Sequence, residues 1–252
     1  MKDLHNKTVI ITGANKGIGL ELVKTFSEKK CNIITCTREA NKEFEKKLNQ
    51  IKNEQDVNIH SYKVDLNDLD SIKKIVKEIY SNHSKIDILI NNAGILYNAL
   101  FLMTTISQIE DTFKINVISQ ILLTQLIAKK MMINKSGNII FFSSSSAKEN
   151  NFGRSIYSSS KSAIESLTKT LSKEFGPYNI RVNAVAPGPV NTDMFKKNTK
   201  EENIKKIVER TANRKIASTR DVANLVSFLA SNISSHINGE IISIDGGLGV
   251  NE

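Results

Sequence analysis

The stretch TVIITGANKGIG, residues 8–19, is the part of the sequence that decides the fold. The apolar and β-branched run Thr8–Thr12 predicts a buried strand, and an amphipathic helix is predicted over Ile18–Lys29. The turn between them needs glycine where φ is positive or where backbone must approach a ligand, and the first N–H groups of a helix bind phosphate. The glycine spacing differs from G-x-G-x-x-G, and a glycine turn is also an ordinary tight connection. The predicted phosphate contacts are Gly13, Asn15, Lys16, Gly17, Ile18 and Gly19.

Outward from this stretch, strand-like apolar runs alternate with amphipathic segments along the chain. Further strands are predicted at Asn32–Thr37, Ile59–Val64, Ile86–Ile90, Asn138–Ser143, Arg181–Val185 and Glu240–Ile244. Further helices are predicted at Leu69–Tyr80, Ile106–Met132, Tyr157–Phe175, Glu201–Arg210 and Asp221–Ala230. Strands that are apolar almost throughout indicate a parallel sheet covered on both faces. We therefore predict an α/β, doubly wound Rossmann fold with a central parallel seven-stranded sheet, whose ligands bind beyond the carboxyl ends of the strands.

Size and composition favour a single domain over residues 1–252. With 40% hydrophobic residues among 252, the chain can bury one large core. The net charge is +9, but 35 basic residues are interleaved with 26 acidic ones, which favours a solvated surface over nucleic-acid binding. The apolar runs are strand-sized and the N-terminus reads MKDLHNK, so we expect no membrane span, no signal peptide and a cytoplasmic protein. Cys31 and Cys36 predict buried thiols, with no disulfide and no metal site.

Two further clusters have the residue types of a ligand site. Asn91–Gly94, of sequence NNAG, follows the fourth predicted strand, where small and amide residues let backbone approach a flat ligand. Tyr157 and Lys161 are four residues apart at the start of a predicted helix, so the hydroxyl and the ammonium share one face. Taken singly, an Asn-Gly cluster is more often a turn, and a Tyr/Lys pair at this spacing is common on surface helices.

Together these residues resemble the short-chain dehydrogenase/reductase family over nearly the whole chain. Gly13, Gly17 and Gly19 are similar to its TGxxxGxG turn, Asn91–Gly94 to its NNAG element, and Tyr157 with Lys161 to its YxxxK pair. The resemblance implies a catalytic set of Asn116, Ser144, Tyr157 and Lys161, and spacing alone selects Ser144 over Ser143 and Ser145. It implies further cofactor contacts from Asp65, Leu66, Asn92, Ala93, Gly94, Tyr157, Lys161, Pro187, Gly188, Val190 and Thr192.

The reaction expected of this set is nicotinamide-dependent interconversion of a carbonyl and a secondary alcohol. Carbonyl reduction needs donors aimed at the oxygen and a proton source, which Tyr157 would supply. An unperturbed tyrosine pKa of about 10 is too high for this at neutral pH, and we expect Lys161 and the oxidised nicotinamide ring to lower it. The resemblance implies that Ser144 hydrogen-bonds the substrate oxygen and that Asn116 holds a water linking Lys161 to solvent.

The end of the second predicted strand favours NADP over NAD. An NAD enzyme of this fold carries a carboxylate there, which binds the ribose 2′-hydroxyl and repels a phosphate. Here the position reads Cys36-Thr37-Arg38, and Arg38 together with Lys16 would bind a 2′-phosphate. Glu39 is the counter-signal, because a one-residue shift of the strand end would turn it toward the ribose.

The segment 187–217 is expected to form a substrate-binding lid, because it contains no clear strand and follows the last expected cofactor contact. Lys196 and Lys197 in it would steer an anionic substrate, unless they form an ordinary solvated face. Within the family, residues 179–183 and 237–247 most resemble 3-oxoacyl-acyl-carrier-protein reductases. Those reductases continue NNAG as GITRD, whereas this chain has GILYN at residues 94–98. An acyl-carrier-bound substrate and a small sugar, polyol or other ketone are therefore both retained.

The resemblance also implies a homotetramer, with the predicted helices Ile106–Met132 and Tyr157–Phe175 at subunit interfaces. Apolar residues on these helices are equally consistent with a well-buried core. The alternative of another class is a catalytically idle NADP sensor or scaffold on the same fold. The intact set of Asn116, Ser144, Tyr157 and Lys161 argues against that alternative.

Overall fold

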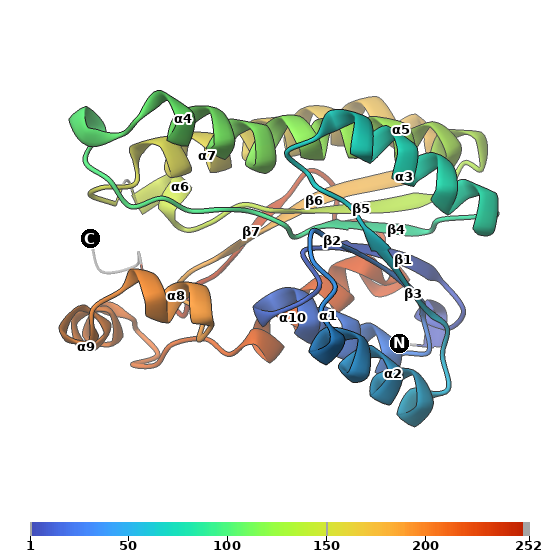
Figure 1. Ribbon diagram of the computed structural model, residues 1–252, viewed down its shortest axis with the longest axis horizontal. Helices are drawn as coiled ribbons and strands as arrows, with labels where there is room; N and C mark the ends of the chain where they lie inside the picture. The colour runs from blue at the N-terminus through green and yellow to red at the C-terminus, as the bar shows by residue number, and fades with distance from the viewer. Residues whose placement is uncertain (1, 150, 249–252) are drawn as a thin grey trace.

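The computed structural model describes residues 2–149 and 151–248, and it shows a sheet between two layers of helices (Figure 1). The seven strands pair in parallel in the order β3-β2-β1-β4-β5-β6-β7. Their bounds are β1 Thr8–Thr12, β2 Asn32–Thr37, β3 Ile59–Lys63, β4 Ile88–Asn91, β5 Gly137–Phe142, β6 Ile180–Pro187 and β7 Ile241–Ile244. The predicted single-domain, doubly wound Rossmann fold is confirmed, and each predicted strand overlaps an observed one.

The helices divide between the two faces of the sheet (Figure 1). Above it in the view lie α3 Leu69–Asn82, α4 Ile106–Phe113, α5 Ser119–Ile133, α6 Ser146–Glu149 and α7 Ser155–Phe175. Below it lie α1 Gly17–Glu28, α2 Lys42–Gln55 and α10 Thr219–Ala230, with α8 Asp193–Asn198 and α9 Glu201–Arg210 to one side. Along β1, Val9 and Ile11 enter the core between the sheet and the helices α1 and α10. Ile10 enters the other core, between the sheet and the helices α3, α5 and α7. Both faces of the strand are buried from Val9 onward, which is why its three central residues are all apolar.

The predicted helix over Ile106–Met132 is confirmed as one uninterrupted helical run, but it contains a π-helical turn that the sequence analysis did not predict. A π-helical segment, Lys114–Ile118, separates α4 from α5. Asn116 lies in this segment, and its side chain makes two hydrogen bonds with the backbone of Ile95. Such π-helical turns occur mostly as local insertions and are frequent at functional sites. The sequence pattern gave no sign of the π-helical turn, and the hydrogen-bond partner of Asn116 lies 21 positions away in the chain.

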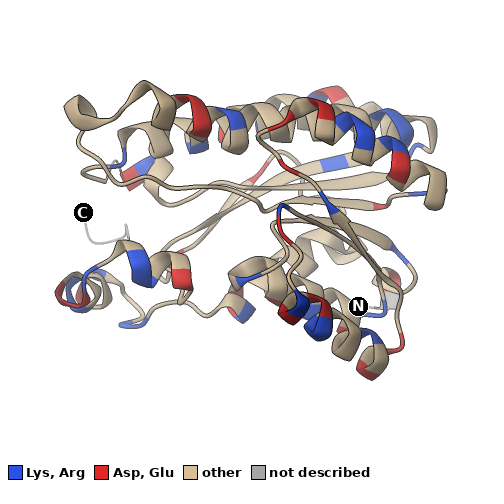
Figure 2. Ribbon diagram, viewed as in Figure 1, with Lys and Arg blue, Asp and Glu red and all other residues tan. Residues whose placement is uncertain are grey.

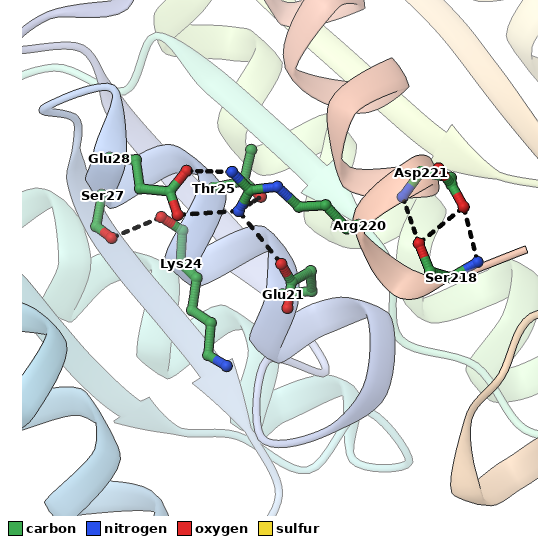
Figure 3. Close-up of polar contacts among 8 residues, drawn as sticks. All are labelled: Glu21, Lys24, Thr25, Ser27, Glu28, Ser218, Arg220 and Asp221. Carbon is green, nitrogen blue, oxygen red and sulfur yellow. Dashed lines mark hydrogen bonds and ion pairs between the residues drawn. The ribbon is translucent and has the colours of Figure 1, made fainter.

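Charged residues lie mainly on the helices, and both signs occur in both helical layers (Figure 2). One set joins α10 to α1: the Arg220 guanidinium donates to Glu21, Thr25 and Glu28 (Figure 3). At the start of α10, Ser218 and Asp221 form a capping box. The contacts of Arg220 hold α1, which follows the glycine turn, against α10, which follows the segment 187–217. Among the described residues, no helix is long and apolar enough to cross a membrane.

Candidate active site

A cleft of about 770 Å³ opens beyond the carboxyl ends of the strands. It lies at the switch point of the sheet order, where β1 and β4 are neighbours and their following helices turn to opposite faces. Of the residues predicted to form the site, nineteen side chains or backbones line this cleft: Gly13, Asn15, Lys16, Gly17, Ile18, Gly19, Arg38, Asp65, Leu66, Asn92, Ala93, Gly94, Ser144, Tyr157, Lys161, Pro187, Gly188, Val190 and Thr192. The remaining one, Asn116, is fully buried behind the wall.

The turn between β1 and α1 is built for close backbone approach. Gly13 and Gly17 have φ of +64° and +53°, which side-chain-bearing residues rarely adopt. A Cβ on Gly19 would lie 2.0 Å from the Gly13 carbonyl oxygen, so this position excludes any side chain. Asn92 Nδ2 donates to the Thr12 carbonyl at 2.8 Å and holds the turn against the end of β4. Within the described part of the chain no side chain caps the start of α1, so its first N–H groups suit a pyrophosphate.

At the far end of this turn, β2 ends at Thr37 as predicted, and Arg38 is the first residue beyond it. Arg38 and Glu39 both line the cleft, and their side chains are largely exposed. Arg38 Nε lies 3.8 Å from Glu39 Oε1. Asp65 lies in the same wall, with one carboxylate oxygen accepting from the Asn67 N–H. This end of the cleft therefore presents a guanidinium and two carboxylates to the adenosine half of a dinucleotide.

Tyr157 and Lys161 project into the cleft from the first turns of α7. Lys161 is 3% exposed, its Nζ donates to the Phe142 carbonyl at 2.8 Å, and it lies 5.7 Å from the Tyr157 ring centroid. Burial lowers the pKa of Lys161 to about 8. Burial raises the pKa of Tyr157, while a hydrogen bond with Ser144 and the charge of Arg154 lower it part of the way back. The expected lowering by Lys161 does not appear here; the nearby charge that acts on Tyr157 is Arg154.

The three serines that spacing left open have different partners. All three line the cleft, and Ser144 is the one whose hydroxyl lowers the pKa of Tyr157; its Oγ also accepts from the Ser146 N–H at 3.2 Å. Ser143 Oγ is bound to Glu165 Oε1 at 2.8 Å. Ser145 is buried, and its N–H donates to the Pro187 carbonyl at 2.9 Å. This geometry favours Ser144 as the donor beside Tyr157.

Asn116 holds the wall behind the reactive side chains. Its Oδ1 accepts from the Ile95 N–H, and its two amide hydrogens go to the Ile95 carbonyl and Ser160 Oγ. Both donors are thus occupied, which leaves one lone pair of Oδ1 for the water expected beside Lys161. A Cβ on Gly94 would lie 3.2 Å from Asn116 Oδ1 and 3.5 Å from Lys161 Nζ. Glycine at that position therefore gives Asn116 and Lys161 access to the same space.

The segment 187–217 leaves the sheet at the end of β6 and returns beside its own start. Val190 and Ala217 form an isolated parallel bridge at its base. Between them lie α8, which the sequence analysis missed, and α9, whose predicted bounds Glu201–Arg210 are confirmed. The cleft is lined by Met194, Phe195, Asn198, Asn203 and Ile207 from this segment. The segment thus has a closed base, and both apolar and amide side chains of it reach the cleft.

Sequence reasoning also missed the opposite wall of the cleft. Glu149, Asn151, Phe152 and Arg154 line it at the end of α6 and the start of α7. Arg154 precedes Tyr157 by three residues, so helical spacing could have placed both on one side of the cleft.

Comparison with known proteins agrees with this geometry. The family model described as short chain dehydrogenase matches residues 7–203. The chain is 35% identical over 245 residues to the 3-oxoacyl-(acyl-carrier-protein) reductase FabG of Aquifex aeolicus, covering 97% of this chain and 98% of that one. It is 32% identical over 244 residues to the acetoacetyl-CoA reductase of Acinetobacter sp., with the same coverage. A putative NAD(P)-dependent gluconate 5-dehydrogenase of Beutenbergia cavernae, solved with bound NADP at low occupancy, superposes with a TM-score of 0.91, 24% identity and 99% coverage of both chains.

Proposed function

The chain belongs to the short-chain dehydrogenase family of NAD(P)-dependent oxidoreductases acting on CH–OH groups, and from this premise we propose that it is an NADP-dependent carbonyl reductase. The observation that supports the reaction most directly is that Ser144, Tyr157 and Lys161 line the same cleft as the glycine turn. A bound reduced nicotinamide would supply the hydride. The side chains of this protein then have to bind the carbonyl oxygen and deliver one proton to it.

Tyr157 donates that proton, and Ser144 donates a hydrogen bond to the same oxygen. The pKa of Tyr157 is raised by burial, so its hydroxyl stays protonated at neutral pH and is ready to donate. Two donors held at the cleft wall stabilise the negative charge that develops on the oxygen during reduction. Lys161 holds its ammonium 5.7 Å from the centroid of the Tyr157 ring, in the same cleft as the glycine turn. Asn116 fixes the backbone of Ile95 and acts as a positioning residue.

Arg38 and Lys16 support the choice of NADP. Both line the cleft at the end where the second strand finishes, and neither forms a buried ion pair in the described structure. A guanidinium binds phosphate oxygens through a planar fork of donors, and a lysine adds a point charge. Glu39 lies in the same wall, but its side chain is 77% exposed and is free to turn toward Arg38 and solvent.

Two substrate classes follow from the comparisons and the cleft. The names of the relatives make a carrier-bound 3-oxoacyl thioester one candidate. The mixed polar and apolar wall of the cleft is also suited to a small ketone. A homotetramer remains a proposal, supported by the exposed apolar side chains of Ile106 on α4, Ile118 in the π-helical segment and Ile133 on α5. The cytoplasmic location and the lid role of residues 187–217 remain predictions from the sequence.

The test is consumption of NADPH or NADH by the purified protein with ketones, sugars and 3-oxoacyl thioesters. We expect turnover with NADPH to exceed turnover with NADH. Cofactor binding without turnover on any member of the panel would instead support the sensor or scaffold alternative. Turnover that is faster with NADH would contradict the NADP assignment but leave the reaction type intact.

A further inference from the structure

Arg154 is a cation in the substrate half of the cleft, one helical turn before Tyr157. It lines the cleft and is partly buried, and its charge acts on the Tyr157 hydroxyl. Its position at the start of α7 is fixed, because its carbonyl accepts the Ser158 N–H at 2.8 Å. The guanidinium therefore lies close to the place where the substrate carbonyl must lie to take a proton from Tyr157.

The charge of Arg154 is not neutralised by the residues around it. Its Nε donates to Asn98 Oδ1 and its NH1 group to Ser146 Oγ, both at 3.3 Å. Both acceptors are neutral, and no carboxylate of residues 2–149 or 151–248 forms an ion pair with it. A guanidinium has five N–H donors, so three remain for a ligand. A partly desolvated arginine with donors to spare is suited to bidentate binding of a carboxylate.

Glu149 is a carboxylate in the same wall of the cleft, and its negative charge acts against the binding of an anion by Arg154. Asn151 Nδ2 donates to both Glu149 Oε2 and Ser146 Oγ, so two intervening side chains separate Glu149 from Arg154. The other Glu149 oxygen is buried and has no hydrogen-bond partner among the described residues. Glu149 thus opposes an anion in this wall, whereas Arg154 attracts one beside Tyr157.

We propose that Arg154 is a specificity-determining residue, which selects ketone substrates carrying a carboxylate by binding that carboxylate while Tyr157 serves the carbonyl oxygen. The inference rests on the proposed function and names the substrate class of the same site. An oxo acid fits this arrangement, because one end pairs with Arg154 and the ketone faces Ser144 and Tyr157. A neutral ester of the same ketone keeps the reacting group and loses the contact with Arg154.

The experiment uses acetoacetate, levulinate and 5-oxohexanoate, each paired with its methyl ester, as substrates of the full-length protein with NADPH. The three acids place the carboxylate at increasing distances from the ketone. For at least one pair, kcat/KM for the acid exceeds that for the ester by roughly tenfold or more. Arg154→Gln removes most of this acid-to-ester ratio, mainly through KM, because the contact is present before the reaction. Arg154→Lys keeps the charge but not the fork, and retains part of the ratio.

Two further variants serve as controls. Lys173→Gln removes the same charge from an exposed position in the last turn of α7, outside the cleft wall, and leaves the ratio unchanged. Glu149→Gln removes a negative charge from the wall itself, and the ratio stays equal or rises. Esters used as well as acids by the unmodified protein, or a ratio unaffected by Arg154→Gln, would overturn the inference.

A failure of the proposed function is separated by direct binding. If neither acids nor esters consume NADPH, calorimetry of the three acids on the NADP-loaded protein replaces the rate measurement. Acid binding that Arg154→Gln weakens at least tenfold supports the inference while the reductase assignment fails. Binding that is undetectable, or equal in the two proteins, overturns the inference as well.

Discussion

The cofactor half and the substrate half of the cleft are built from different parts of the chain. The cofactor half is made by backbone: Gly13 and Gly17 at positive φ, and Gly19 with no room for a side chain against the Gly13 carbonyl. The substrate half is made by side chains, including Arg154 and Glu149 from one wall and Met194 from the other. Backbone approach requires glycine at fixed spacing, whereas a side-chain wall can be built from many residue types.

This difference explains why the reaction type is easier to derive than the substrate. A dinucleotide imposes one geometry on the turn after β1, so the sequence there is constrained. The part of the cleft around Tyr157 is lined largely by side chains of α6, α7 and the segment 187–217, which can change without altering the fold. Tyr157 and Lys161 lie at the boundary between the halves. Variants of these residues and of each half can therefore test whether the division is real.

The largest expected effect is that of Tyr157→Phe, which removes the proton donor of the boundary. Turnover should fall by roughly 10²–10⁴-fold, the usual contribution of a positioned acid or base. NADPH affinity should change little, because the hydroxyl acts on the substrate oxygen. Steady-state kcat and cofactor titration by fluorescence measure the two effects. Tyr178→Phe removes an exposed hydroxyl elsewhere as the control. A variant that keeps more than a few per cent of kcat would remove Tyr157 from this role.

The second prediction concerns Lys161→Met, which should affect both halves. We expect weaker cofactor binding together with lower turnover, because the ammonium lies beside Tyr157 and Gly94 in the cleft. The variant should also be more stable than the unmodified protein at pH 7, by about 2–6 °C in Tm, since it no longer buries a cation. Loss of the bond to the Phe142 carbonyl offsets part of that gain.

The Tm advantage of Lys161→Met over the unmodified protein should decrease as the pH rises. Burial lowers the pKa of Lys161 from 10.5 to about 8. The folded state therefore binds fewer protons than the unfolded state between pH 8 and 10.5, and the unmodified protein gains stability as pH rises through that interval. The Tm advantage of Lys161→Met should shrink over the same range in thermal melts. Equal pH dependence of the two proteins would mean that Lys161 is not buried as a cation.

The fold was predictable from sequence because burial on both sheet faces leaves a direct pattern. The run Thr8–Thr12 is apolar or β-branched at every position, since neighbouring side chains enter different cores. The π-helical turn at Lys114–Ile118 was not predictable, because the backbone of Ile95, with which Asn116 exchanges two hydrogen bonds, is distant in sequence. Helical spacing could have placed Arg154 on the same side as Tyr157, but only the structure shows that its hydrogen-bond partners are neutral.

The third prediction concerns the cofactor half, where the side chains of Lys16 and Arg38 rather than the backbone would determine the preference for NADPH over NADH. NADPH should be favoured over NADH in kcat/KM by roughly ten- to a thousandfold, from two charge-assisted contacts discounted for exposure. Lys16→Ala combined with Arg38→Ala should erase most of that preference, and the preference should weaken as salt is added. Lys24→Ala combined with Lys29→Ala removes two charges outside the cleft and should leave it unchanged. Equal use of both cofactors by the unmodified protein would contradict the assignment.

The smallest expected effect is that of Arg220→Gln, at the contact that joins the two halves behind the cleft. Arg220 begins α10 directly after the segment 187–217, and it binds Glu28 and Glu21 on α1, whereas the Lys24 side chain points away from it (Figure 3). The side chain of Arg220 is 43% exposed, so solvent screening limits the pair to about 1 kcal/mol or less and the Tm loss to about 2–4 °C. Lys24→Gln on the same helix should cost less. If the two halves are energetically separate, KM for NADPH and the acid-to-ester ratio should both stay within roughly twofold. A tenfold change in KM for NADPH or in the acid-to-ester ratio, with a Tm loss of the expected size, would show instead that α10 couples the segment 187–217 to the glycine turn. The two halves of the cleft would then not be energetically separate.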